Sequence, residues 1–307
     1  MKRYREHRFL RSNGRPNFSS RVYQVESELE DLMTKNVITV TRSRSIKDCI
    51  DIMAGHNVRR TPVVNAEGKL SGIVTATDVV NYFGGGEYYK IILNKHQKSI
   101  YSAFNEPVSS IMTRGVIKAY YYDKLTDALE KMIKFNVGGL PVVLEDERVV
   151  GIITEADVLR QLSGNIPEMR AGEIMSENLV TVSPDMTLKE VAKVIISEGV
   201  RRLPILTGKK PIGIISTMDI VRYLSSGEPY RKAVGGDIEY AINIKITDIA
   251  STEVISVKES ALLEDVLETM LERNIGGVLV VDEKDELKGI ITERDLLYTV
   301  VLKEEMS

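Results

Sequence analysis

The sequence predicts a mixed α/β fold, of the α+β kind, built from four copies of one small unit. The first observation is a seven-residue signature ending in aspartate, which occurs at residues 72–78, 151–157, 213–219 and 289–295. The second is the same order of strand and helix patterns ahead of each signature. Because repeats of this length bury their apolar faces against one another, fold and function are interpreted first per repeat and then per assembly.

Each copy has the pattern β-α-β-β-α. In the first copy, residues 37–40 form an expected strand, and Ser45 is a suitable cap for a helix. Residues 61–65 and 70–75 are two further strands, and a second helix is expected from around residue 77 or 78. The first helix of every copy carries an apolar stripe at helical spacing, in chain order Ile46, Ile50 and Met53; Leu125, Leu129 and Met132; Leu188, Val191 and Ile195; Leu263, Val266 and Met270.

The copies open at equivalent dipeptides and are joined by unequal linkers. The dipeptides are Met33-Thr34, Met112-Thr113, Met175-Ser176 and Ala250-Ser251. The linker sequence at 86–90 resembles that at 227–231, which indicates that a two-repeat module was duplicated. The predicted organisation is therefore a basic tail at 1–24, and repeats at 25–86, 87–165, 166–227 and 228–307, where the second and fourth ranges include their preceding linkers.

A single copy is small for an independent hydrophobic core. Two consecutive repeats are therefore expected to pair, sheet against sheet, into one module. Two modules would stack into a disc, either within one chain or completed by a second chain as a homodimer. The sequence does not choose between these.

Composition indicates a globular, cytoplasmic protein. Of 307 residues, 43% are hydrophobic, which is enough for ordinary cores. No stretch approaches the roughly 20 apolar residues that cross a bilayer, and the N-terminus lacks the apolar segment of a secretory signal. With Cys49 as the single cysteine and three histidines, no zinc or haem ligand set can be assembled, so no metal cofactor is expected. Cys49 is expected on a helix, in the core.

The N-terminal 21 residues are strongly basic. They contain seven Lys or Arg residues against Glu6 alone, whereas the whole chain has a formal charge of −3. Such an arm could contact nucleic acid or an acidic partner. The alternative is a solvated terminal tail without a binding role.

Three motifs together carry a family resemblance. They are the opening dipeptides, a central motif and the terminal Gly-Ile-Ile/Val-Thr/Ser-x-x-Asp. The central motif is VRRTPVV at 58–64, VGGLPVV at 137–143, VRRLPIL at 200–206 and IGGVLVV at 275–281. Over about 270 of the 307 residues, the chain resembles a four-repeat CBS-domain protein with two Bateman modules in series. It is similar to the gamma subunit of AMP-activated protein kinase and its stand-alone archaeal relatives.

The resemblance implies adenine-nucleotide sites in clefts between paired repeats. It implies that ribose is held by Asp78, Asp157, Asp219 and Asp295, and that Thr75, Thr154, Ser216 and Thr292 face the phosphate. An ionised aspartate suits paired ribose hydroxyls, and a hydroxyl beside free helix amides suits a phosphate. The alternative is that each aspartate only caps its helix, which by itself is worth roughly 0.5–2 kcal/mol. All four copies keep the aspartate, unlike the kinase subunit, so the number of occupied sites cannot be transferred.

Arginine pairs distinguish the odd-numbered repeats from the even-numbered ones. Arg59-Arg60 and Arg201-Arg202 stand where repeats 2 and 4 have glycine pairs. Guanidinium groups match phosphate with a planar fork of donors, and the resemblance implies phosphate contact at this position. The alternative is a solvated strand edge. For adenine, the candidates are the apolar residues of the opening strands, Ile38, Ile117, Val180 and Ile255, which suit a hydrophobic core equally well.

The predicted function is a non-catalytic sensor that binds AMP, ADP or ATP and regulates a protein acting in trans. No phosphate-binding loop, nucleophile elbow or metal-ligand cluster indicates an enzyme, and no membrane contact is expected. One alternative is a nucleic-acid-binding regulator that uses residues 1–21. Another is a sensor of S-adenosylmethionine or methylthioadenosine, ligands that need the ribose aspartate but no phosphate-binding arginine.

Overall fold

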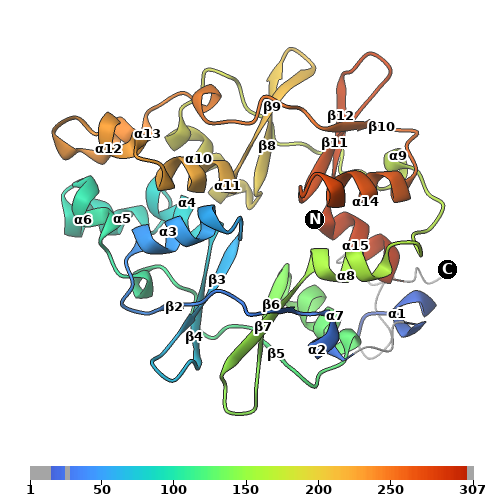
Figure 1. Cartoon of the computed structure of the whole chain (residues 1–307). Coiled ribbons are helices and arrows are strands. Elements are labelled where there is room, and N and C mark those ends of the chain that lie inside the picture. The colour runs from blue at the N-terminus through green and yellow to red at the C-terminus, as the bar shows by residue number, and fades with distance from the viewer. Residues whose placement is uncertain (1–14, 25–27, 303–307) are drawn as a thin grey trace. The chain divides into compact units, whose positions relative to one another are not determined.

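The computed structural model describes residues 15–24 and 28–302 of the chain. These residues form two compact units, each assembled from segments far apart in sequence (Figure 1). The odd unit comprises residues 38–116 and 180–254, which are most of repeats 1 and 3. The even unit comprises, of the described residues, 15–24, 28–37, 117–179 and 255–302, which include most of repeats 2 and 4. Each unit is described separately.

The odd unit contains a β-α-β-β-α copy from repeat 1, an α-β-β-α copy from repeat 3, and their helical linkers. Its repeat 1 elements are β2 (Val40–Thr41), α3 (Ile46–Gly55), β3 (Arg60–Val64), β4 (Leu70–Thr75), α4 (Ala76–Gly84), α5 (Tyr89–His96), α6 (Ile100–Phe104) and the 3-10 turn η3 (Val108–Ser110). Its repeat 3 elements are α10 (Leu188–Glu198), β8 (Arg202–Thr207), β9 (Lys210–Ser216), α11 (Thr217–Ser225), α12 (Glu228–Lys232), η4 (Val234–Gly236), α13 (Ile238–Ile242) and η5 (Ile246–Asp248).

The even unit has the same arrangement without the long linker helices. Its first part and repeat 2 give α1 (Ser20–Gln24), α2 (Leu29–Leu32), β1 (Thr34–Lys35), β5 (Ala119–Tyr120), α7 (Leu125–Phe135), β6 (Gly139–Val143), β7 (Val149–Thr154) and α8 (Glu155–Leu162). The remaining elements are α9 (Ala171–Ile174), β10 (Ser256–Lys258), α14 (Leu263–Glu272), β11 (Gly277–Val281), β12 (Leu287–Thr292) and α15 (Glu293–Val301).

The predicted fold class is confirmed, as is the order of elements in repeats 1, 2 and 4; in repeat 3 the predicted opening strand is reduced to a single bridge between Val182 and Ile205. Ser45 caps α3 as predicted, accepting a hydrogen bond from the Asp48 amide at 3.0 Å. The opening strand of repeat 1 is shorter than predicted, because only Val40–Thr41 pair with β3. The second helix begins at Ala76, one residue before the predicted start. This difference places Asp78 at the third helical position, where its side chain can bond back to Thr75.

The opening dipeptides do not pair with the sheet of their own repeat. Thr34 pairs with Ile152 of repeat 2, and Thr113 pairs with Ile73 of repeat 1. Ser176 and Ile290 of repeats 3 and 4 form an equivalent bridge. Consecutive repeats are therefore interlocked by an exchanged segment.

The pairing of each opening segment with a neighbouring repeat explains why the seven-residue signature begins with glycine. A Cβ placed on Gly151 would lie 2.3 Å from the Met33 sulfur, and one on Gly289 would lie 2.5 Å from the Met175 sulfur. Two carbon-sized groups cannot approach so closely. The opening methionine and the signature glycine thus form one contact, although more than 100 residues separate them in each of these two cases.

Each unit buries one apolar core that joins two non-consecutive repeats. In the odd unit α4 packs on α10 and α3 packs on α11, with Val80 and Ile195 among the fully buried side chains. In the even unit α8 packs on α15. Cys49 is fully buried on α3, as predicted, and burial raises the pKa of its thiol to about 12. The residue is therefore a small core side chain.

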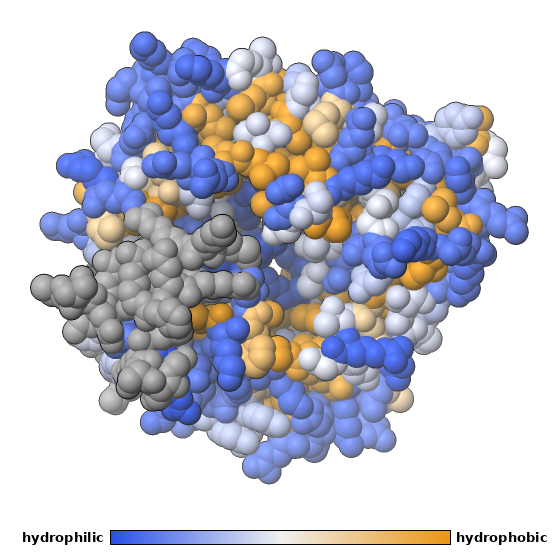
Figure 2. Space-filling view, turned by 180° about the vertical axis from the view of Figure 1, so that it is seen from behind, coloured by the Kyte–Doolittle hydropathy of each residue, from blue (hydrophilic) through white to orange (hydrophobic). Residues whose placement is uncertain are grey.

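Some large apolar side chains remain at the surface. On the linker helices of the odd unit, Tyr101, Val234 and Tyr240 are each more than half exposed, and the Tyr101 ring stacks on Tyr230 with centroids 5.6 Å apart. Figure 2 shows hydrophobic residues reaching the surface among polar ones. Scattered exposure of this kind is ordinary for a folded protein.

Candidate ligand-binding sites

The Thr-x-x-Asp motif forms a reciprocal cap at the start of the second helix of each repeat. In repeat 1 the Thr75 amide and hydroxyl both donate to Oδ2 of Asp78, at 2.8 and 2.6 Å. The Asp78 amide donates back to Thr75 Oγ1 at 3.3 Å. The same three bonds form in the other repeats, between Thr154 and Asp157, Ser216 and Asp219, and Thr292 and Asp295. One carboxylate oxygen of each aspartate is therefore occupied by capping, and the other remains for further contacts.

Strand pairing brings the arginine pairs to these caps. In the ladder between β3 and β4, Arg60 is the direct cross-strand partner of Thr75. Arg202 and Ser216 have the same relation in repeat 3. In addition, the Arg59 carbonyl accepts the first helix amide, that of Ala76, at 2.9 Å. An arginine pair, a hydroxyl residue and an aspartate thus belong to one sheet end in each odd-numbered repeat.

Repeats 2 and 4 present glycine at the same end. Gly139 is opposite Thr154, and Gly277 is opposite Thr292. Backbone can approach more closely at these positions, while the cationic side chains are missing. The alternation seen in the sequence is therefore an alternation of arginine and glycine at the strand position opposite each cap.

The aspartates differ in their electrostatic surroundings. Burial raises the pKa of Asp78, and hydrogen bonds from Thr75 partly oppose this rise. The pKa of Asp295 is likewise raised by burial and partly lowered by Thr292. The carboxylates of repeats 2 and 3 instead have a cation three residues later: Arg160 is 3.2 Å from Asp157 Oδ1, and Arg222 is 2.9 Å from Asp219 Oδ1.

Arg160 and Arg222 were not among the residues predicted from the sequence. The signal was present, because residues three apart on a helix are neighbours. The sequence analysis also missed Thr34, whose hydroxyl lies 3.5 Å from Asp157 Oδ1. No pattern in repeat 1 indicates that its opening dipeptide reaches the aspartate of repeat 2.

The four residues predicted for adenine lie in the opening segments of their repeats and are half-buried: Ile38, Ile117, Val180 and Ile255. Ile117 and Ile255 pack against the core of the even unit, and Val180 against that of the odd unit. Ile38 lies two residues before Val40, whose parallel partner is Val63. It is therefore near the end of β3 that carries Arg60. Their contact with adenine stays a prediction.

The described part of the N-terminal tail is docked on the even unit. Phe18 and Val22 are buried, and the Ser19 amide donates to the Val301 carbonyl at 2.8 Å. Arg15 lies 3.6 Å from Glu130. Residues 15–24 are therefore not a solvated tail, whereas most of the predicted nucleic-acid arm, residues 1–14, lies outside the described residues.

The described residues contain no group of three or more His, Cys, Asp or Glu side chains suited to a metal ion. Across the same part of the chain, no helix combines the length and the apolar character needed to span a membrane.

The four caps coincide with four matches to one family model. The model of the CBS domain matches residues 29–85, 108–164, 171–226 and 246–301. The chain belongs to the CBS-domain family. The predicted family resemblance and the repeat count are thereby confirmed.

Known relatives support this membership of the CBS-domain family. The chain is 34% identical over 265 residues to the uncharacterised protein MJ1225 of Methanocaldococcus jannaschii, covering 86% of this chain and 95% of the relative. The crystal structure of MJ1225, proposed as an archaeal homolog of g-AMPK, superimposes with a TM-score of 0.84 at 33% identity, covering 88% of this chain and 99% of that one.

Two further relatives extend the comparison. An uncharacterised 33.4 kDa protein from the ribosomal RNA operon of Thermofilum pendens is 29% identical over 84% of this chain and 86% of its own length. The CBS-domain pair of protein MJ0100, crystallised with 5′-methylthioadenosine and S-adenosyl-L-methionine, covers 46% of this chain and 98% of its own, at 31% identity and a TM-score of 0.37.

Proposed function

We propose that this CBS-domain protein binds adenine nucleotides, AMP, ADP or ATP, at its Thr-x-x-Asp caps, and that binding regulates a partner protein in trans. The observation that carries the proposal is the cross-strand pairing of Arg60 with Thr75 and of Arg202 with Ser216. This pairing supports the proposal, because it sets an arginine, whose guanidinium group suits a phosphate, at the sheet end that carries the aspartate cap. A cap alone would not require the arginines.

The ribose would be held by the second carboxylate oxygen. In Asp78, Oδ2 is occupied by Thr75, whereas Oδ1 has no hydrogen-bond partner among the described residues. An ionised oxygen of this kind accepts bonds from ribose hydroxyls, and a bond to a charged group is worth about 1.5–3 kcal/mol. The adenine would lie against the apolar opening segment, with Ile38 in repeat 1.

In this proposal the arginine pairs make most of the contacts with the phosphate. The Thr75 hydroxyl proton is donated to Asp78, so the hydroxyl retains acceptor capacity but no donor for a phosphate oxygen. Contact between a phosphate and Thr75, Thr154, Ser216 or Thr292 therefore requires the hydroxyl to turn away from its aspartate. Arg59, Arg60, Arg201 and Arg202 each carry several guanidinium N–H donors, which match the oxygens of a phosphate.

Regulation requires that a ligand bind two conformations with unequal affinity. AMP, ADP and ATP differ only in their phosphates, so the arginines are the groups able to discriminate among them. No catalytic step is proposed. In this proposal the signal passes to a separate protein.

The test is calorimetry of the nucleotide-free protein with AMP, ADP and ATP, repeated with Asp78→Asn. Asparagine can keep its oxygen on Thr75 and so preserve the cap, but it places an amide where Oδ1 was. We expect at least about tenfold weaker binding at that site, from the loss of one charge-assisted bond. The matched control is Asp127→Asn, because Asp127 caps α7 by accepting the Lys124 amide at 3.1 Å and belongs to no proposed site.

The phosphate-free alternative is tested with the same protein. S-adenosylmethionine binding that survives Arg60→Ala, combined with no binding of the three nucleotides, would favour the S-adenosyl sensor. Nucleotide binding that Arg60→Ala weakens, with S-adenosylmethionine inactive, would favour the proposed function. Absence of binding for all four ligands would leave the aspartates as helix caps and refute the proposal.

A further inference from the structure

Two arginines lie on the carboxylates that the proposed function assigns to ribose. Arg222 Nη1 donates to Asp219 Oδ1 at 2.9 Å, and Arg160 Nη1 donates to Asp157 Oδ1 at 3.2 Å. Both aspartate side chains are largely buried, with 13% and 12% of their surface exposed. The equivalent helical position holds Asn81 in repeat 1 and Tyr298 in repeat 4, neither of which is a cation.

Arg222 has a second hydrogen-bond partner, which Arg160 lacks among the described residues. Its Nη2 donates to Asn57 Oδ1 at 2.8 Å. Asn57 directly follows the end of α3, in the left-handed conformation with φ of 51°, and lies two residues before Arg59. The guanidinium thus joins the cap of repeat 3 to the turn that leads into the arginine pair of repeat 1.

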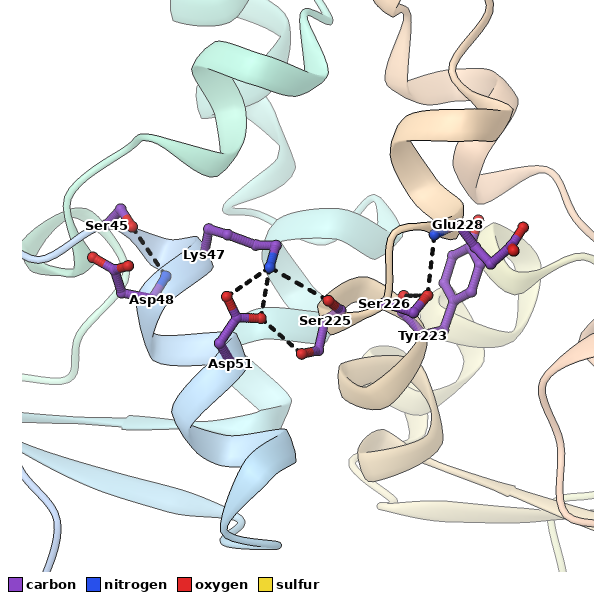
Figure 3. A network of polar contacts seen from close by, with 8 residues as sticks. All are labelled: Ser45, Lys47, Asp48, Asp51, Tyr223, Ser225, Ser226 and Glu228. Carbon is purple, nitrogen blue, oxygen red and sulfur yellow. Dashed lines mark hydrogen bonds and ion pairs between the residues drawn. The ribbon is translucent and has the colours of Figure 1, made fainter.

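A polar network holds the two helices concerned in place (Figure 3). Lys47 Nζ on α3 donates to both oxygens of Asp51 at 2.6 Å, and Ser225 Oγ at the end of α11 donates to the same carboxylate at 2.7 Å. Ser225 lies one turn beyond Arg222. The backbone that carries Arg222 is therefore fixed by this network. Little further conformational entropy is lost when its guanidinium group binds Asp219 and Asn57.

We propose that Arg222 and Arg160 set the affinity of the repeat 3 and repeat 2 sites by competing with ribose for the second carboxylate oxygen. This inference rests on the proposed function. In repeat 1 the corresponding oxygen of Asp78 has no hydrogen-bond partner among the described residues, so ribose binds without displacing a cation. In repeats 2 and 3 an arginine must first leave. The sites therefore fall into a readily occupied class and a latched class, and Arg222 is the stronger latch because of Asn57.

The experiment measures binding of adenosine and AMP by calorimetry to the full chain and to Arg222→Met, which keeps the apolar stem and removes the fork. Adenosine isolates the ribose contact, because it carries no phosphate that a distant arginine could attract. An ion pair whose arginine is half or more exposed is worth up to about 1 kcal/mol, so removing it should tighten adenosine binding at one site by about 3- to 5-fold. Arg160→Met should give a smaller gain at another site.

Three further variants locate the effect. Asn57→Gly keeps the left-handed backbone and removes the second anchor, so it should give part of the Arg222→Met gain. Adding Asp219→Asn to Arg222→Met should abolish the gain. The matched control is Arg231→Met, because Arg231 forms an equivalent pair with Glu228 three residues earlier, on α12 and away from the caps.

Each outcome decides the proposal. Unchanged or weaker adenosine binding by Arg222→Met, while wild-type protein binds normally, would overturn the latch and leave the proposed function standing. An equal gain from Arg231→Met would also overturn it, because the effect would then be one of general charge. If neither wild type nor variant binds any adenosine ligand, the proposed function fails and the latch fails with it.

Discussion

A close contact between two helices of the odd unit gives a quantitative test of the core. Gly84 is buried in the last turn of α4, facing Ala192 of α10. A Cβ added at Gly84 would lie 2.1 Å from the Ala192 Cβ and 3.2 Å from its Cα. Carbon atoms pack best at about 3.5–4.0 Å, so the two helices would have to separate by roughly 1.5 Å.

The cost of Gly84→Ala follows from the fact that neither methyl group can rotate away. Overpacking in a well-packed core costs about 1–3 kcal/mol, and a contact this short belongs at the upper end. Alanine in place of glycine within a helix gains about 1 kcal/mol, which offsets part of this cost. We therefore expect the free energy of unfolding to fall by about 2 kcal/mol.

The assay is urea unfolding followed by circular dichroism, since the chain contains no tryptophan. Ala192→Gly should recover stability in the Gly84→Ala protein, relative to its effect in wild type, because it removes the facing methyl. The control is Gly55→Ala at the end of α3, where a new Cβ meets no atom within 4 Å and should be neutral or stabilising. Equal stability of Gly84→Ala and wild type, or no interaction between the two substitutions, would refute the reasoning.

Two further predictions concern the exchanged segment and a buried acid. Gly151→Ala should lower the free energy of unfolding by about 1–2 kcal/mol, which is less than for Gly84→Ala because the flexible Met33 side chain can move. Met33→Ala should recover part of this loss in the Gly151→Ala protein. If the effects of the two substitutions are simply additive, the predicted contact between the two residues is contradicted. Burial alone would raise the pKa of Glu106, but hydrogen bonds from Lys95, Ser110 and His96 lower it below its ordinary value. A lowered pKa in the folded state stabilises the protein above the ordinary glutamate range, and this contribution is lost as pH falls through the lowered value. Glu106→Gln should therefore lower the free energy of unfolding by about 1–3 kcal/mol at pH 7. In wild-type protein the free energy of unfolding should fall as the pH drops below about 5, and in the variant this fall should be smaller. An equal fall in both proteins would show that other acidic residues cause it.

Local features of each repeat were predictable because their causes lie within a few residues. Ser45 caps α3 through a hydrogen bond to the Asp48 amide three residues later. β4 was predicted with its observed bounds, because a β-branched run follows a turn. The cap formed by Thr75 and Asp78 also lies within four residues, so the sequence alone placed a carboxylate at the start of α4.

Which residues meet at the candidate site could be known only from the register of the strands. The sequence placed Arg60 and Thr75 in separate motifs, and their direct pairing follows from the ladder between β3 and β4. The contacts of Arg222 were even harder to predict from the sequence, because its second hydrogen-bond partner, Asn57, is 165 residues away in the chain. A repeated pattern indicates the role that equivalent positions share, but it does not show contacts that differ between copies.

The sequence by itself determined the number of repeats, the order of their elements and the caps, since each depends on local periodicity and short-range hydrogen bonds. Only the tertiary structure decided that repeats 1 and 3 share one core and repeats 2 and 4 share the other, and that each opening dipeptide pairs with a neighbouring repeat. The physical reason is that four similar apolar stripes are equally able to bury one another. Contacts such as Gly84 against Ala192, which depend on the fit of two particular surfaces, select the partner.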